Sequence, residues 1–173
     1  MKNKLALIFT FLLILMSAFS CSHSENEEAE SLFRHGFKFE NQNNWLEAIS
    51  YYDKILKQFS TRTETELQEQ VARAYFYKGH SFYRMGEADY AIATYDEMLD
   101  QFNSSQTKSI QFYVANVIFN KGLTLDIQHK PLEASACYKE VIKRFNSSEF
   151  PNIKSTVAMA VAGSEGKLRK SAK

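Results

Sequence analysis

The side chains that could support acid–base, nucleophilic or metal chemistry are few and scattered. Four histidines and two cysteines occur in 173 residues: His23, His35, His80, His129, Cys21 and Cys137. Catalysis needs a nucleophile or base beside an orienting partner, and no histidine shows such a partner in the sequence. Ligand spacings of the C-x-x-C or H-E-x-x-H type and glycine-rich phosphate loops are absent. We therefore expect no enzyme activity, no metal site and no cofactor, and we expect His80 to be an isolated polar contact.

Cys21 is the one side chain whose surroundings suggest covalent chemistry. Residues 1–20 have the order of an export signal, in which two lysines precede an apolar stretch and small residues come last. The apolar stretch is 15 residues long, shorter than the ~20 that span a bilayer. The segment Ala18-Phe19-Ser20-Cys21 resembles a bacterial lipobox, which implies cleavage before Cys21 and lipid attachment to its thiol. Phe19 is bulkier than the usual residue there, so ordinary cleavage after Ser20 stays open.

These features predict an exported protein that is lipid-anchored to a membrane of the cell envelope and faces the periplasm. A soluble periplasmic protein is the alternative. Residues 21–28 would form a polar tether, and residues 29–170 the folded domain. Cys137 then has no partner for a disulfide, and its place beside Tyr138 in a predicted helix indicates a small core residue.

The charge distribution argues against a nucleic-acid partner. Two of the 21 basic residues lie in the leader, and all 20 acidic residues follow it. The chain after residue 20 therefore has a formal net charge of −1. Both signs are interspersed along the chain, whereas binding to nucleic acid needs clustered Lys and Arg. The one basic cluster, residues 167–173, is interpreted as the solvated end of a helix.

The elements that must position any site recur every 43 residues. The register is marked by Gly36, Gly79 and Gly122, and similar connectors occupy 57–63, 100–106 and 143–149. Apolar residues within each copy recur at helical spacing, without strand-like alternation. Such a repeat is one helical hairpin, which buries its apolar side only against its neighbours. We predict seven antiparallel helices, namely three pairs and a last helix from Asn152 to about Lys170 that caps the array with a polar outer side.

The landmark residues of each copy resemble those of the tetratricopeptide repeat. They read Leu32, Gly36, Phe39, Ala48, Tyr52 and Ile55; then Tyr75, Gly79, Phe82, Ala91, Tyr95 and Met98; then Ile118, Gly122, Leu125, Ala134, Tyr138 and Val141. The copies lack the family's terminal proline and exceed its period of about 34 residues. The resemblance, which covers residues 29 to about 165, implies an all-α fold: a TPR-type α-solenoid of three helix-turn-helix repeats with a 43-residue period, plus a C-terminal capping helix.

The resemblance also implies a partner-binding groove, because the leading helix of each pair lines the concave face in this family. The implied groove residues are Phe33, Phe37, Arg73, Phe76, His80, Tyr83, Asn116, Phe119 and Leu123, with Glu40 and Asp126 further along the same helices. Phe33, Phe76 and Phe119 are equivalent in the three copies, and they would form a ladder for an extended peptide or an amphipathic helix. Alternatively, these rings cover the seams between the leading helices.

The predicted function is therefore that of a non-enzymatic scaffold of the bacterial cell envelope, which holds a protein or peptide on its concave face. The Lys and Asn residues with which some members of the family clamp C-terminal carboxylates are missing here, because Phe33, Phe37 and Phe76 stand in the groove. The alternative is a structural subunit of a larger envelope complex, of the outer-membrane assembly or envelope-constriction type.

Overall fold

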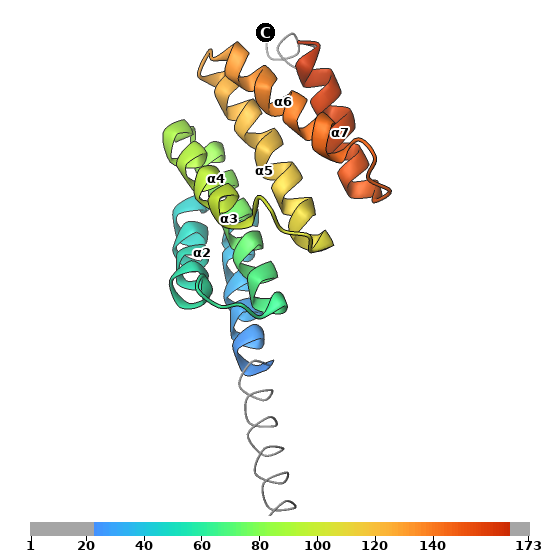
Figure 1. Ribbon diagram of the computed structural model, residues 1–173. Coiled ribbons are helices and arrows are strands. Elements are labelled where there is room, and N and C mark those ends of the chain that lie inside the picture. Colours follow the sequence, from blue (N-terminus) through green and yellow to red (C-terminus); the bar gives the residue numbers. More distant parts are fainter. Residues whose placement is uncertain (1–22, 167–173) are drawn as a thin grey trace, which may run out of the picture.

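The computed structural model describes residues 23–166, and all regular structure in this range is helical. Seven helices follow one another: the first helix (23–41), α2 (Trp45–Phe59), α3 (Thr65–Met85), α4 (Ala88–Phe102), α5 (Lys108–Ile127), α6 (Pro131–Phe145) and α7 (Pro151–Ser164) (Figure 1). This arrangement confirms the predicted all-α solenoid of three helix pairs and a final helix. The expected leader with Cys21 and the basic cluster 167–173 lie outside the described residues.

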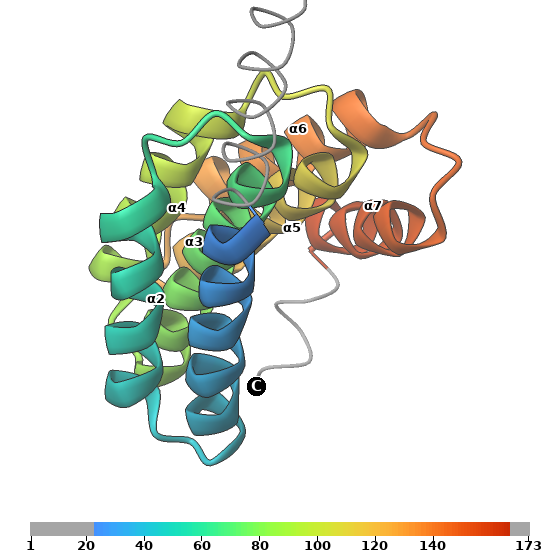
Figure 2. The same ribbon diagram turned by 90° about the horizontal axis from the view of Figure 1, so that it is seen from below.

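The helices form two layers of a curved array (Figures 1 and 2). The first helix, α3, α5 and α7 make the inner layer, in which α3 packs on α5 and α5 packs on α7. The outer helices α2, α4 and α6 pack chiefly on inner helices rather than on one another. Successive helices touch one another in the inner layer but are separated in the outer layer. The array therefore curves so that the inner layer forms the concave side.

A tyrosine seated against a glycine holds each helix pair together. Each repeat has one such completely buried tyrosine: Tyr52, Tyr95 and Tyr138. A Cβ atom built on the glycine of the same pair would lie 2.8 Å from a ring carbon at Gly36, 2.3 Å at Gly79 and 2.6 Å at Gly122. Carbon atoms in close-packed interiors stay further apart than this. The predicted tight helix crossings are thus confirmed, and only glycine permits them without a shift of the ring or the helix.

The buried tyrosines also contact the following repeat. A Cβ on Gly163 of α7 would lie 2.8 Å from the Tyr138 ring, so this ring is held between α5 and α7. Two periods earlier in the sequence, Tyr77 of α3 lies against Tyr52, with ring centroids 6.1 Å apart. Each of these tyrosines therefore joins its own helix pair to the leading helix of the next repeat.

The turn inside each pair is built in the same way in all three copies. The residue with positive φ is Asn43 (57°), Gly86 (81°) or His129 (59°), again 43 residues apart. In the second copy the Glu87 N–H donates to the Phe82 carbonyl and the Gly86 N–H to Tyr83, and the equivalent bonds occur in the other copies. This pattern ends a helix through a left-handed residue and satisfies its last carbonyls. Asn tolerates this conformation better than most non-glycine residues.

Ion pairs between repeats recur with the same period. Lys78 Nζ lies 2.7 Å from Asp53 Oδ1, and Lys121 pairs with Asp96 one period later. Both pairs join an outer helix to the inner helix of the next repeat. Such half-exposed pairs contribute little stability on their own, but they show that the outer-to-inner contact is the same at both junctions.

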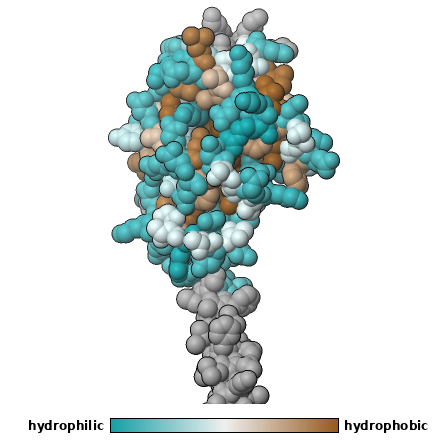
Figure 3. Space-filling model, viewed as in Figure 1, coloured by the Kyte–Doolittle hydropathy of each residue, from teal (hydrophilic) through white to brown (hydrophobic). Residues whose placement is uncertain are grey.

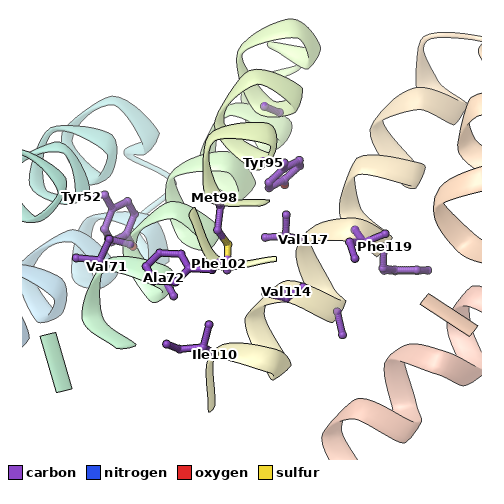
Figure 4. Close-up of a cluster of buried hydrophobic side chains, with 14 of the residues drawn as sticks. Tyr52, Val71, Ala72, Tyr95, Met98, Phe102, Ile110, Val114, Val117 and Phe119 are labelled. Carbon is purple, nitrogen blue, oxygen red and sulfur yellow. The ribbon is translucent and has the colours of Figure 1, made fainter. Parts of the chain in front are cut away.

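The core runs without interruption through the repeats. Side chains of α3, α4 and α5 meet in it, among them Met98, Ile110 and Val117, which are completely buried (Figure 4). Cys137 lies half-buried against this core, as predicted, and burial raises the pKa of its thiol. Hydrophilic side chains dominate the face seen in Figure 3, with apolar ones in small patches between them. No helix in the described part of the chain is long and apolar enough to cross a membrane.

The two ends of the array differ from expectation. Residues 23–28, expected in a tether, are helical and begin the first helix, where Glu25 pairs with Arg62 and Asn26 accepts a hydrogen bond from Gln70. At the other end, the predicted polar outer side of α7 is wrong, because Met159 and Val161 are 40% and 39% exposed. Gly163 of the same helix meets the Tyr138 ring, whereas Val161 is exposed.

The glycine–tyrosine contact predicts the effect of one methyl group. Gly79→Ala should lower the free energy of unfolding by about 1–3 kcal/mol, because the Tyr95 ring or a helix must shift. Urea unfolding followed by circular dichroism measures this loss. In a Tyr95→Ala background the ring is gone, so the same substitution should cost much less. An equal cost in both backgrounds would contradict the contact.

Candidate functional site

Two of the predicted groove aromatics are part of the core. Phe33 is 7% exposed and packs on Tyr52 and Tyr77, and Phe119 is 4% exposed and packs on Tyr138. Arg73 closes the surface over Phe33, with its guanidinium carbon 3.6 Å from the ring centroid. The Phe33 ring thus covers the seam between the first helix and α3, which is the alternative considered from the sequence, whereas the Phe119 ring packs within its own helix pair.

The aromatic surface that remains on the concave face is a diagonal row, which we call the aromatic strip: Phe37, Tyr77, Phe76, Tyr113 and Phe112. Its consecutive ring centroids are 5.6, 5.0, 5.8 and 5.2 Å apart, in the range of favourable aromatic pairs. Phe37 is 39% exposed and the other four rings are partly exposed. The strip crosses the first helix, α3 and α5, so it spans three consecutive inner helices.

The strip differs from the predicted ladder because neighbouring inner helices are offset along their axes. A ring therefore meets a ring about one to two helical turns away from its repeat equivalent: Phe37 meets Tyr77 and not His80, and Phe76 meets Tyr113 and not Phe119. The sequence did contain a signal for this, since Phe76-Tyr77 and Phe112-Tyr113 are adjacent aromatic pairs on predicted inner helices. Tyr77, Phe112 and Tyr113 were not among the predicted groove residues.

Four other predicted groove residues make internal contacts. The Arg73 guanidinium pairs with Glu30, and Asn116 donates to the Phe112 carbonyl and accepts from the Thr156 hydroxyl. Tyr83 packs beside His80, and Leu123 packs against the core. Arg73 and Asn116 thus join neighbouring inner helices, and the structure gathers Phe37, Phe76 and His80 around the strip.

His80 is not the isolated group that the sequence suggested. Its Nδ1 lies 2.6 Å from Glu40 Oε1, and the Tyr52 hydroxyl donates to Glu40 Oε2 at 2.8 Å. Glu40 is 7% exposed, so both partners are needed to offset the cost of burying its charge. Burial and then the Glu40 carboxylate raise the pKa of Tyr52, which stays a neutral donor.

The spacing of Glu40 and His80 matches that of another contact between the same two helices. They are 40 residues apart, as are Glu30 and Gln70, which also form a hydrogen bond. Since the repeat is 43 residues long, a separation of 40 places two residues on adjacent inner helices about one turn apart. This offset is a property of the packed helices, and the sequence alone does not give it.

A hollow lies at each end of the aromatic strip. The N-terminal hollow, of about 310 Å³, is lined by Phe37, Glu40, Asn41, Asn43, Trp45, Tyr77, His80 and Arg84. The C-terminal hollow, of about 510 Å³, is lined by Lys108, Ser109, Phe112, Tyr113, Phe150, Pro151, Asn152 and Ile153. The two differ in chemistry, because the first has polar and charged walls and the second has mainly apolar ones.

Proton chemistry at the strip is restricted. Burial raises the pKa of Tyr113 to about 12, partly offset by Arg73. Burial and then Glu40 raise the pKa of Tyr77 in the same way. These phenols are therefore neutral hydrogen-bond donors near pH 7. Within residues 23–166 no group of three or more His, Cys, Asp or Glu side chains is arranged to hold a metal ion.

Comparison with known families agrees with this geometry. Residues 30–61 and 73–105 each match the family model of the tetratricopeptide repeat. These matches begin in the first helix and in α3 and end just after α2 and α4. No curated protein matches the chain.

The Glu40 network predicts coupled stability effects. Tyr52→Phe should lower the free energy of unfolding by about 1.5–3 kcal/mol, because a hydrogen bond to a charged group is lost. Glu40→Ala should also destabilise, and the double variant should lose less than the sum of the two. Urea unfolding of the four proteins gives the coupling. Tyr95→Phe is the matched control, since Tyr83 and not a carboxylate occupies the position equivalent to Glu40. If the Tyr52→Phe, Glu40→Ala double variant loses the sum of the two single losses, the network is refuted.

Proposed function

Because the chain is a tetratricopeptide repeat protein, we propose that it binds a protein segment of the bacterial cell envelope along its aromatic strip. Tetratricopeptide repeats are protein-interaction scaffolds, and this chain carries two matched copies. The observation that supports the strip as the contact surface is its continuity across three inner helices, with every ring partly exposed.

The form of the strip favours an extended segment. Its rings follow one another at 5.0–5.8 Å and lead from one hollow to the other. An extended chain can place successive side chains against such a row, with larger side chains in the hollows. Aromatic rings give a large contact area and lose little side-chain entropy on binding. The scaffold itself needs no catalytic group for this task.

The location in the envelope is part of the proposal and rests on the sequence. The leader of residues 1–20 and the lipobox-like segment that ends at Cys21 support export and acylation. A diacylated cysteine would attach the protein to a membrane, because each buried methylene contributes about 0.8 kcal/mol. Residue 23, two positions after Cys21, already lies in the first helix, so the array would stand near the membrane surface.

A second candidate function is that of a subunit in a larger envelope complex. It is favoured by four apolar side chains away from the strip: Leu46, Tyr90, Ile127 and Leu132, which are 67%, 61%, 59% and 86% exposed. All four lie where an inner helix turns into its outer partner, so they share one edge of the array. Exposed apolar side chains along one edge are typical of a surface that another subunit covers.

The two candidates predict different crosslinking. A photoreactive amino acid at position 76, in the strip, should capture a partner in intact cells, and mass spectrometry would identify it. The same residue at position 90, on the turn edge, is the matched control. Phe76→Ser with Phe37→Ser should then weaken capture of the purified partner at least tenfold, while circular dichroism stays unchanged. Capture from position 90 alone, and unchanged binding by the double variant, would favour the subunit role and reject the strip.

The lipid anchor has its own test. If Cys21 is acylated, the wild-type protein should sediment with membranes after cell lysis. The Cys21→Ser protein should then appear in the soluble fraction. The substitution removes only the acylated thiol, so the folded domain should keep its circular dichroism spectrum. A Cys21→Ser protein that still sediments with membranes would show that no acyl chain at this residue holds it there.

A further inference from the structure

The N-terminal hollow is the place where the chain departs most from its own repeat. His80 is equivalent to Phe37 and Leu123, Trp45 to Ala88 and Pro131, and Arg84 to Asn41 and Ile127. The equivalent positions at the other junctions are mostly apolar, so stacking of the repeats does not require a histidine, a tryptophan or an arginine there. These three residues line one hollow of about 310 Å³.

Arg84 presents a positive charge that the fold holds in place. Its guanidinium carbon lies 4.7 Å from the centroid of the Trp45 ring, in the arrangement of a cation–π pair. Within residues 23–166 no carboxylate lies in ion-pair distance of it. A guanidinium stacked in this way keeps its N–H donors directed around the ring edge and available for a ligand.

His80 adds a second polar side chain beside it. Glu40 occupies Nδ1 of the ring, which leaves Nε2 for a ligand in the hollow, and the ring is 31% exposed. Glu40 itself is buried and already accepts from two groups. Its charge is therefore turned toward Tyr52 and His80, and the donors on the open side of the hollow are the Arg84 guanidinium and the amides of Asn41 and Asn43.

We propose that this hollow binds an acidic side chain, Asp or Glu, of the segment that lies on the aromatic strip. The inference rests on the proposed function and specifies the chemistry of the partner. A carboxylate matches a guanidinium in a charge-assisted, planar pair. Phe37 and Tyr77 also line the hollow, and apolar walls lower the local dielectric constant and so strengthen such a pair. Apolar side chains next to the carboxylate would continue onto the strip, so the partner segment combines an acidic residue with apolar ones.

Trp45 allows a direct test, because it is the only tryptophan of the chain and it lines the hollow. The probe is 3-phenylpropionate, which joins a carboxylate to an aromatic ring, and the matched neutral probe is 3-phenylpropionamide. Added to the folded protein, the acid should change the Trp45 fluorescence in a saturable manner. The amide should bind at least tenfold more weakly, since it lacks the charge that pairs with Arg84.

Variants locate the effect. Arg84→Gln should weaken binding of 3-phenylpropionate at least tenfold. The matched control is Lys54→Gln, which removes another cation stacked on a ring, 4.2 Å from the Tyr51 centroid on α2, and should leave the titration unchanged. Equal binding of acid and amide, or an unchanged titration in Arg84→Gln, would overturn the inference. If the strip variants still lose the partner in that case, the proposed function stands without the acidic contact.

Discussion

The seating of a tyrosine ring directly against a glycine is the contact on which the array depends. In each pair the ring occupies the space where a side chain of the facing helix would otherwise be, as Tyr95 does at Gly79. The hydrocarbon of a fully buried tyrosine contributes stability in proportion to the area removed from water, and the close approach adds dispersion contacts. Because the same ring also reaches the next inner helix, one residue per repeat sets both the geometry of the pair and the step to the next pair.

The constant displacement from one helix pair to the next explains why polar contacts recur at fixed separations in the sequence. The outer-to-inner ion pairs join residues 25 apart, and the inner-to-inner hydrogen bonds of Glu40 and Glu30 join residues 40 apart. A regular stack of hairpins repeats whatever contact its neighbours make. The polar pairs thus repeat at the register that the tyrosine–glycine packing sets, whereas buried aromatic and aliphatic side chains form the core.

The sequence predicted those parts of the structure that depend on spacing within one repeat. Glycine, alanine and tyrosine at fixed positions were enough to give the helix pairs, their order and their crossings. The site depends instead on how far one inner helix slides along the next, and this distance is not encoded in any single repeat. For that reason Phe33 and Phe119, which were expected in the groove, are buried, and the Glu40–His80 contact was missed. The predicted polar outer side of α7 was wrong because Met159 and Val161 are exposed there, while Gly163 faces Tyr138.

The positions that vary between copies separate stability from recognition in this protein. Positions that pack are uniform, as the three glycines and three buried tyrosines are, because any change there would open the stack. Trp45, His80 and Arg84 break the period, yet α2 packs on α3 at their junction as α4 packs on α5 at the next one. At the opposite end of the strip the hollow around Phe150 is largely apolar. A segment lying between two such unlike ends gains different contacts in its two possible directions, so an array of nearly identical hairpins can still bind its partner in one orientation.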